Sequence, residues 1–195
     1  MAILKGLLAP LQFVNTHVLR LGRAIAVFAM AIMVLSILYQ VVMRYGFNAA
    51  PNWSEELARF CMLWMTGLVA PAAYRRGGFV AIDTLTMLLP RNIGAVLNFV
   101  LLALALLVLV VALQLGLKHV NSGWLFASSS LRLPLDLIGM APVKLKLAWM
   151  FMSLYVGVIL LTSVTVELLL RQLVRLTGGG DDLPPLPTLD TPGAE

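Results

Sequence analysis

The chain has 195 residues, of which 61% are apolar and 12% are charged, whereas soluble domains average about 45–50% and about 25%. Its 14 Lys and Arg outnumber its 9 Asp and Glu, for a formal charge of +5. This composition excludes a water-soluble globular enzyme and indicates a membrane protein with several spans. The single cysteine, Cys61, excludes an intramolecular disulfide, and without a basic stripe interleaved with aromatic residues we expect no nucleic-acid partner.

The first membrane-length apolar run is residues 24–43, which contains no charge and is followed by Arg44. Residues 1–23 mix apolar side chains with polar and charged ones, so we expect an amphipathic segment at the membrane interface, on the cytoplasmic side. No short apolar region precedes a small-residue cleavage site. We therefore expect an uncleaved signal anchor and no cleaved signal peptide.

Three further spans follow. Residues 53–74 keep their charges in the first two turns, and residues 92–117 carry none. The last span is residues 147–170, where Glu167 is followed four residues later by Arg171, so the two side chains can pair on one helix face. The predicted fold class is an all-α membrane protein with four transmembrane helices.

Two segments do not fit a simple span. Residues 118–146 are apolar but interrupted by serines, Pro134 and Asp136, which predicts a periplasmic interfacial or re-entrant segment. Residues 178–195, rich in Gly and Pro, are expected to form a disordered cytoplasmic tail. Four spans place both termini on one side, with eight Lys and Arg there against six on the other side. This excess, together with the basic residues before the first span, predicts that both termini are cytoplasmic.

The centres of the four spans contain no Asp, Glu, Lys, Arg or His. A substrate or proton pathway through a membrane protein usually contains such a residue. The two histidines, His17 and His119, fall at opposite membrane faces under this topology, so they cannot jointly bind a metal or haem. We therefore expect no enzymatic activity and no cofactor or metal in this chain.

The start of the second span has the pattern of a helix N-terminus. Asn52 is a good N-cap, and Glu55 three residues later completes a capping box. In one interpretation this turn is only a well-capped helix start. In the other, Glu56 is surplus to the cap and meets a partner subunit. The candidate partner contacts here are Arg44, Trp53, Glu56 and Arg59.

A second charged cluster follows the second span, where Arg75 and Arg76 precede Gly77 and Gly78. The arginines can act as positive-inside anchors while the glycines end the helix. Alternatively, the arginines bind the helix ends of a partner or lipid phosphates. Candidate partner contacts in this region are Arg75, Arg76 and Asp83.

These features occur in a recognisable order over about residues 40–90. The order of Arg44-Tyr45, Pro51, Trp53-Ser54-Glu55-Glu56-Leu57, a span, Arg75-Arg76-Gly77-Gly78 and Asp83 resembles the DctQ-type small membrane subunit of tripartite ATP-independent periplasmic (TRAP) transporters. The length and the four spans fit this resemblance.

The resemblance implies a multi-pass protein of the bacterial inner membrane that is not itself the carrier. Its partners would be a large DctM-type membrane subunit, a periplasmic substrate-binding protein and phospholipid. The large subunit would hold the organic-acid and sodium sites and move as an elevator, against which the small subunit stays fixed. By the family's pattern, Trp53 and Glu56 would lie on the periplasmic side near the large subunit, and Arg75, Arg76 and Asp83 on the cytoplasmic side.

Two other functions remain alternatives at this point. A membrane-anchor subunit of a respiratory haem or quinone enzyme would need paired histidines within its spans, which this sequence lacks. An autonomous small exporter would usually keep an acidic residue inside a span, and none occurs at the span centres.

Overall fold

The protein is described by a computed structural model that covers residues 2–49, 51–76, 91–133 and 143–177. Four helices and two short strands form within these residues. The helices are α1 (Ala2–Gly46), α2 (Asn52–Arg75), α4 (Arg91–Gly123) and α5 (Ala148–Leu176), and the strands are β1 (Ala127–Leu133) and β2 (Val143–Lys146). Each of these helices is long and apolar enough to cross a membrane. The predicted fold class is confirmed.

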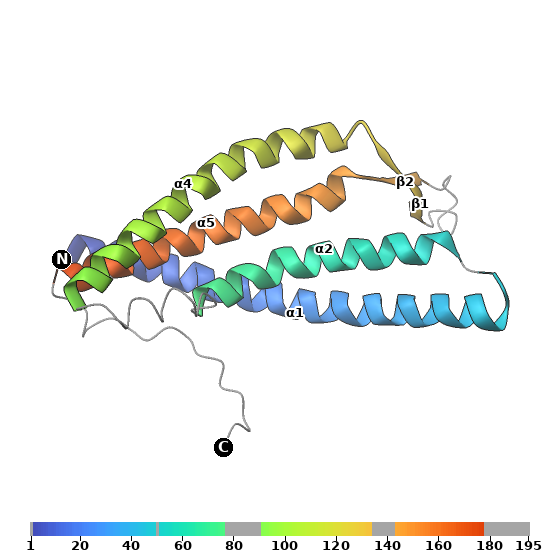
Figure 1. The fold of residues 1–195 in the computed structure, drawn as a ribbon, viewed down its shortest axis with the longest axis horizontal. Coiled ribbons are helices and arrows are strands. Elements are labelled where there is room, and N and C mark those ends of the chain that lie inside the picture. The colour runs from blue at the N-terminus through green and yellow to red at the C-terminus, as the bar shows by residue number, and fades with distance from the viewer. Residues whose placement is uncertain (1, 50, 77–90, 134–142, 178–195) are drawn as a thin grey trace, which may run out of the picture.

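The helices lie side by side in the order α1, α2, α5, α4 (Figure 1). The helix α2 packs against both α1 and α5, whereas α4 packs mainly against α5. Large apolar side chains are exposed along α1 and α4, and no residue in the most apolar part of α4 is buried. Such surfaces are expected where helices face lipid or another membrane protein.

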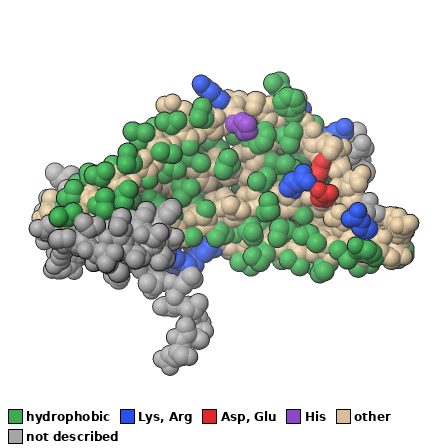
Figure 2. Space-filling model, in the orientation of Figure 1, with side chains coloured by type: hydrophobic (Ala, Val, Ile, Leu, Met, Phe, Trp, Pro, Cys, Tyr) green, Lys and Arg blue, Asp and Glu red, His purple; other side chains and the backbone are tan. Residues whose placement is uncertain are grey.

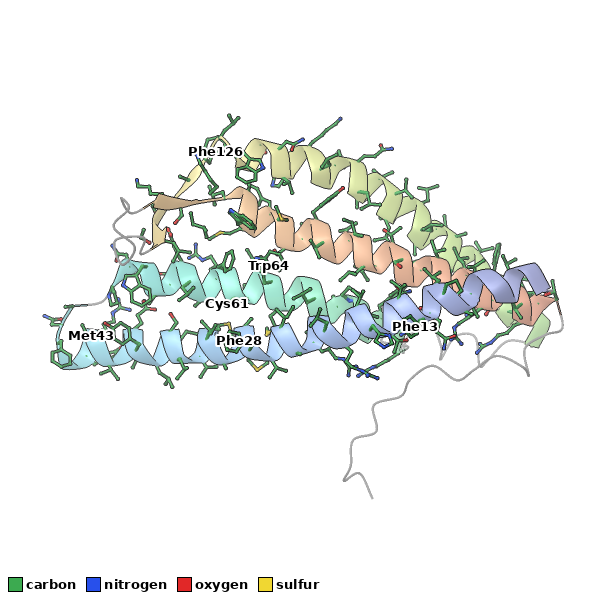
Figure 3. All side chains as sticks on the ribbon, turned by 180° about the vertical axis from the view of Figure 1, so that it is seen from behind. Phe13, Phe28, Met43, Cys61, Trp64 and Phe126 are labelled. Atoms are coloured by element: carbon green, nitrogen blue, oxygen red, sulfur yellow. The ribbon has the colours of Figure 1, made fainter. Side chains whose placement is uncertain are left out.

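The first helix differs from the prediction of an interfacial segment followed by a span. α1 is one continuous helix of 45 residues, roughly 68 Å long at 1.5 Å per residue. Its N-terminal part, around Phe13, runs across α5 (Figure 3). There Asn15 bonds to α5 and Thr16 to α2. Asn15, one of the polar residues that suggested an interfacial segment, is therefore buried against another helix.

The segment predicted as interfacial or re-entrant, residues 118–146, takes a different form. α4 continues to Gly123, and β1 and β2 then pair as an antiparallel sheet in which Ala127 faces Lys146 and Leu133 faces Val143. Antiparallel pairing satisfies the backbone groups that a loop would leave free at the membrane surface. Residues 134–142 and the predicted tail, 178–195, lie outside the described residues.

α2 and α5 approach most closely where small residues face each other. A Cβ atom on Gly157 would lie 2.9 Å from the carbonyl oxygen of Gly67, and a Cβ atom on Gly67 would overlap the carbonyl of Ser153. Only glycine at both positions permits this backbone distance. The close crossing fixes the middle of α2 against α5.

Candidate functional site

The residues predicted to contact a partner lie at the two ends of α2. Trp53, Glu56 and Arg59 lie at its first turns, beside β1 and β2, and we call this the strand end of the molecule (Figure 1). Arg75 and Arg76 lie at the opposite end, which we call the arginine end. Arg44 lies in the last turn of α1, at the strand end. Asp83 lies outside the described residues.

At the strand end, Glu56 is held by strand β1. The hydroxyl groups of Ser128 and Ser129 donate to its carboxylate. The backbone N–H groups of Ser130 and Leu131 donate to Oε2 at 3.2 and 2.8 Å. Since both carboxylate oxygens accept hydrogen bonds within the chain, Glu56 anchors the first strand to α2. Whether Glu56 also contacts a partner stays a prediction.

The predicted capping box at the start of α2 is wrong. The N-cap residue is Pro51, no side chain caps the helix, and Asn52 is the first helical residue. The Ser54 hydroxyl donates to the carbonyl oxygen of Pro51 at 2.7 Å. Glu55 pairs instead with Arg59 one turn later, at 2.6 Å, because this i,i+4 spacing places the two side chains on one face.

The remaining predicted residues at the strand end are available at the surface. Trp53 is 42% exposed and its ring centroid lies 5.7 Å from that of Tyr39. Arg59 is exposed beside its partner Glu55, and Arg44 is exposed at the end of α1. Figure 2 shows acidic side chains at the strand end of an otherwise largely hydrophobic face. These positions form a polar and aromatic surface that could contact another protein.

The arginine end contains a buried ion cluster centred on Glu167. This side chain is 0% exposed, and Arg75, which is 4% exposed, donates to its Oε1 from two guanidinium nitrogens at 2.7 and 3.2 Å. Arg171 forms a second ion pair with the same oxygen at 3.4 Å. The predicted pairing of Glu167 with Arg171 is confirmed.

Two polar residues of α1 complete this cluster. Asn15 donates to the other oxygen of Glu167 at 2.8 Å and accepts a hydrogen bond from Ser163. Arg75 also donates to the Thr16 hydroxyl at 2.9 Å. The cluster therefore joins α1, α2 and α5, and Arg75 has almost no surface to offer to a partner.

Sequence reasoning missed the Arg75–Glu167 contact because the two residues are 92 positions apart. A signal was present: Glu167 is the one acidic residue of the fourth span, and an acid near apolar residues needs a counter-charge. The contact between Glu56 and the serines of β1 was equally hidden, because it joins residues more than 70 positions apart.

Metal-ligating side chains do not gather in the described part of the chain. There, no group of three or more His, Cys, Asp or Glu residues could hold a metal ion. His17 contacts the carbonyl oxygen of Phe13 near the arginine end, whereas His119 stacks on Phe151 near the end of α4. The histidines thus lie at opposite ends of the helices, as the predicted topology requires.

The fold and its charged ends define an integral membrane protein in which apolar helices are joined by buried polar contacts. Residues 33–175 match the model of the family "Tripartite ATP-independent periplasmic transporters, DctQ component". The chain belongs to this family, as its sequence motifs indicated. The described residues that form those motifs, from Arg44 to Arg76, lie within the matched region.

A curated relative supports the same assignment over a shorter region. The chain is 32% identical over 71 residues to the "Putative TRAP transporter small permease protein" of Haemophilus influenzae. This region covers 36% of the chain and 44% of the relative. The chain thus spans less than half the length of the curated relative that it matches.

We predict that Glu167→Gln strongly destabilises the protein. The substitution removes the negative charge between Arg75 and Arg171, and breaking a buried ion pair in this way costs about 3–5 kcal/mol. The control Glu55→Gln, at an exposed pair, should lower the free energy of unfolding by less than about 1 kcal/mol. Denaturant unfolding in mild detergent measures both values, and equal losses would contradict the role assigned to Glu167.

We predict that Glu56→Ala releases β1 from α2 without unfolding the helices. The variant leaves the N–H groups of Ser130 and Leu131 without their carboxylate acceptor. Hydrogen–deuterium exchange of residues 127–133 should become faster, while exchange in α5 stays unchanged. Glu55→Ala is the neighbouring control, and equal exchange of this strand in both variants would refute the anchoring role.

Proposed function

We propose that this protein is the small permease subunit of a TRAP-type secondary transporter and serves as the stationary scaffold for a large membrane subunit. In this proposal the large subunit carries the organic acid and the coupling sodium ions, and a periplasmic binding protein delivers the substrate. Membership of the DctQ family and the name of the curated relative support the assignment to a TRAP transporter.

The placement of charge is the observation that carries the scaffold role. Among the described residues, the carboxylates are Glu55 and Glu56 at the strand end and Glu167 at the arginine end. Each of them is engaged by side chains or backbone of the same chain. A carrier would keep such groups turned toward a substrate or ion pathway. Here Glu56 joins α2 to a strand, Glu167 joins three helices, and Glu55 pairs within its own helix.

The packing of α2 also supports a stationary role. Glu56 fixes its first turn to β1, Gly67 fixes its middle to α5, and Arg75 fixes its last turn to α1 and α5. A helix held at three levels resists sliding and rocking relative to its neighbours. Such a unit provides a rigid surface against which another subunit can move.

The proposed contacts with the large subunit include side chains that remain exposed. At the strand end these are Arg44, Trp53 and Arg59, and Glu56 supports them by holding β1 in place. At the arginine end we propose the half-buried Arg76, and we also propose Asp83, which lies outside the described residues. Arg75 acts within the chain by pairing with Glu167.

We predict that the tagged full-length protein recovers a much larger polytopic protein when it is purified in mild detergent from cells that also express its cognate large subunit. The double variant Trp53→Ala/Arg59→Glu should lower this recovery severalfold, because it removes an aromatic anchor and reverses a charge. Lys118→Glu, also exposed at the strand end, serves as the control. Recovery of the chain alone, with organic-acid uptake unchanged in cells that lack it, would refute the proposed function.

We further propose that the protein lies in the bacterial inner membrane with both termini in the cytoplasm. The arginine end would then face the cytoplasm, because the membrane-spanning chain carries more Lys and Arg on that side. Cysteine labelling in intact cells tests this orientation with little background, because the native Cys61 is buried. Ser122→Cys should react with an impermeant maleimide and Arg175→Cys should not, and the reverse pattern would exclude the orientation.

A further inference from the structure

A cluster of arginines surrounds a small cavity at the arginine end. The cavity measures about 40 Å³, which is space for about three water molecules at ~10–15 Å³ each. Its basic lining comes from both α1 and α2, and Thr16, Leu19 and Ala72 complete its wall. The lining arginines are Arg20, Arg23, Arg75 and Arg76.

Three of these guanidinium groups are not neutralised within the part of the chain that the structure describes. Glu167 is the carboxylate described at this end, and it is already bound by Arg75 and Arg171. The Nε atom of Arg23 is buried and has no hydrogen-bond partner there. Burial and the neighbouring charge of Arg23 lower the pKa of Arg76. The described residues at this end therefore carry an excess of positive charge that favours an anion.

An apolar groove lies next to this cavity. It has a volume of about 520 Å³ and lies between α1 and α2, with Arg23 at its rim. The hydroxyl group of Thr66 donates to the carbonyl oxygen of Met62 in its own helix, so it offers no free donor to a polar ligand. The other lining residues are apolar: Ala26, Val27, Met30, Met65, Val69 and Ala70.

Arg23 lines both the cavity and the groove, so the two lie next to each other between α1 and α2. Along α1 the groove extends from Arg23 to Met30, which is roughly 10 Å at 1.5 Å per residue. A membrane lipid has the same order of parts, with its phosphate at the surface and its chains parallel to the helices. A free anion would use the cavity but would leave the groove empty.

We propose that an anionic phospholipid binds between α1 and α2, with its phosphate on Arg20, Arg23 and Arg76 and one acyl chain in the groove. Basic pockets between transmembrane helices bind acidic headgroups in this manner. The lipid neutralises the excess charge and covers the apolar groove at the same time. This site does not require the transport function proposed above, although Arg76 also belongs to the surface proposed there for the large subunit.

The test is lipid binding to the purified full-length protein in mild detergent, measured by native mass spectrometry. Dioleoyl phosphatidylglycerol should bind roughly tenfold more tightly than dioleoyl phosphatidylcholine, which has the same chains but no net charge. Glycerol 3-phosphate, which has the anionic group without chains, should not compete at equal concentration.

Variants separate the two halves of the site. Arg20→Gln/Arg23→Gln should weaken binding of phosphatidylglycerol roughly tenfold, whereas the charge-matched control Lys118→Gln/Lys144→Gln, at exposed lysines of the strand end, should not. Ala70→Phe should also weaken it by filling the groove from an exposed position. The melting temperature of each variant without lipid separates lost binding from lost folding.

Several results would overturn the proposal. Equal binding of the two lipids would exclude charge recognition, and efficient competition by glycerol 3-phosphate would indicate a site for a free anion. Equal losses in the two double variants would indicate a general effect of charge. Loss of the bound lipid when the large subunit is present would assign this surface to the protein partner.

Discussion

The structure depends on the burial of Glu167 between two arginines. A carboxylate that is fully removed from water is tolerated only when it is paired and hydrogen-bonded. Its oxygens are bound by Arg75 from α2, Arg171 from α5 and Asn15 from α1. Because apolar side chains gain nothing by leaving lipid for one another, such polar contacts specify how helices are placed in a membrane. Glu167 therefore determines which parts of α1, α2 and α5 meet.

The same principle acts at the strand end, but with a different partner. Glu56 accepts hydrogen bonds from backbone N–H groups of β1 and thereby holds this strand against the first turns of α2. Between these two ends, α2 and α5 are held by the direct backbone contact of Gly67 with Ser153 and Gly157. The central helix is thus fixed by hydrogen bonds, by close packing and by an ion cluster. The exposed apolar surfaces of α1 and α4 make no comparable polar or close-packed contacts within the described part of the chain.

Local patterns in the sequence correctly predicted the structural features that depend on residues close together in the chain. The four spans follow from runs of apolar residues, and the Glu167–Arg171 pair follows from its helical spacing. The interior partner of Arg75 was missed, because an i,i+4 rule says nothing about residues far apart in the chain. The predicted capping box was wrong although Asn52 and Glu55 have the right spacing. The helix begins at Asn52, one residue earlier than a capping box with Asn52 as the N-cap requires. The interfacial segment was expected because polar residues interrupt the apolar ones near the N-terminus, and the sequence does not show that Asn15 has its partner on another helix.

Acidic and basic residues have different tasks in this protein. The described carboxylates each have a partner in the same chain: Glu56 and Glu167 join different elements, and Glu55 pairs with Arg59 within α2. Several basic side chains remain exposed at both ends of the helices, including Arg20, Arg44 and Lys144. The charge that this protein presents to its surroundings is therefore mainly positive. At the arginine end this favours acidic lipid headgroups, and at the strand end it favours an acidic surface on another protein. The described acids thus serve the protein's own architecture, as do the buried Arg75 and Arg171, whereas the exposed bases are available for contacts with other molecules.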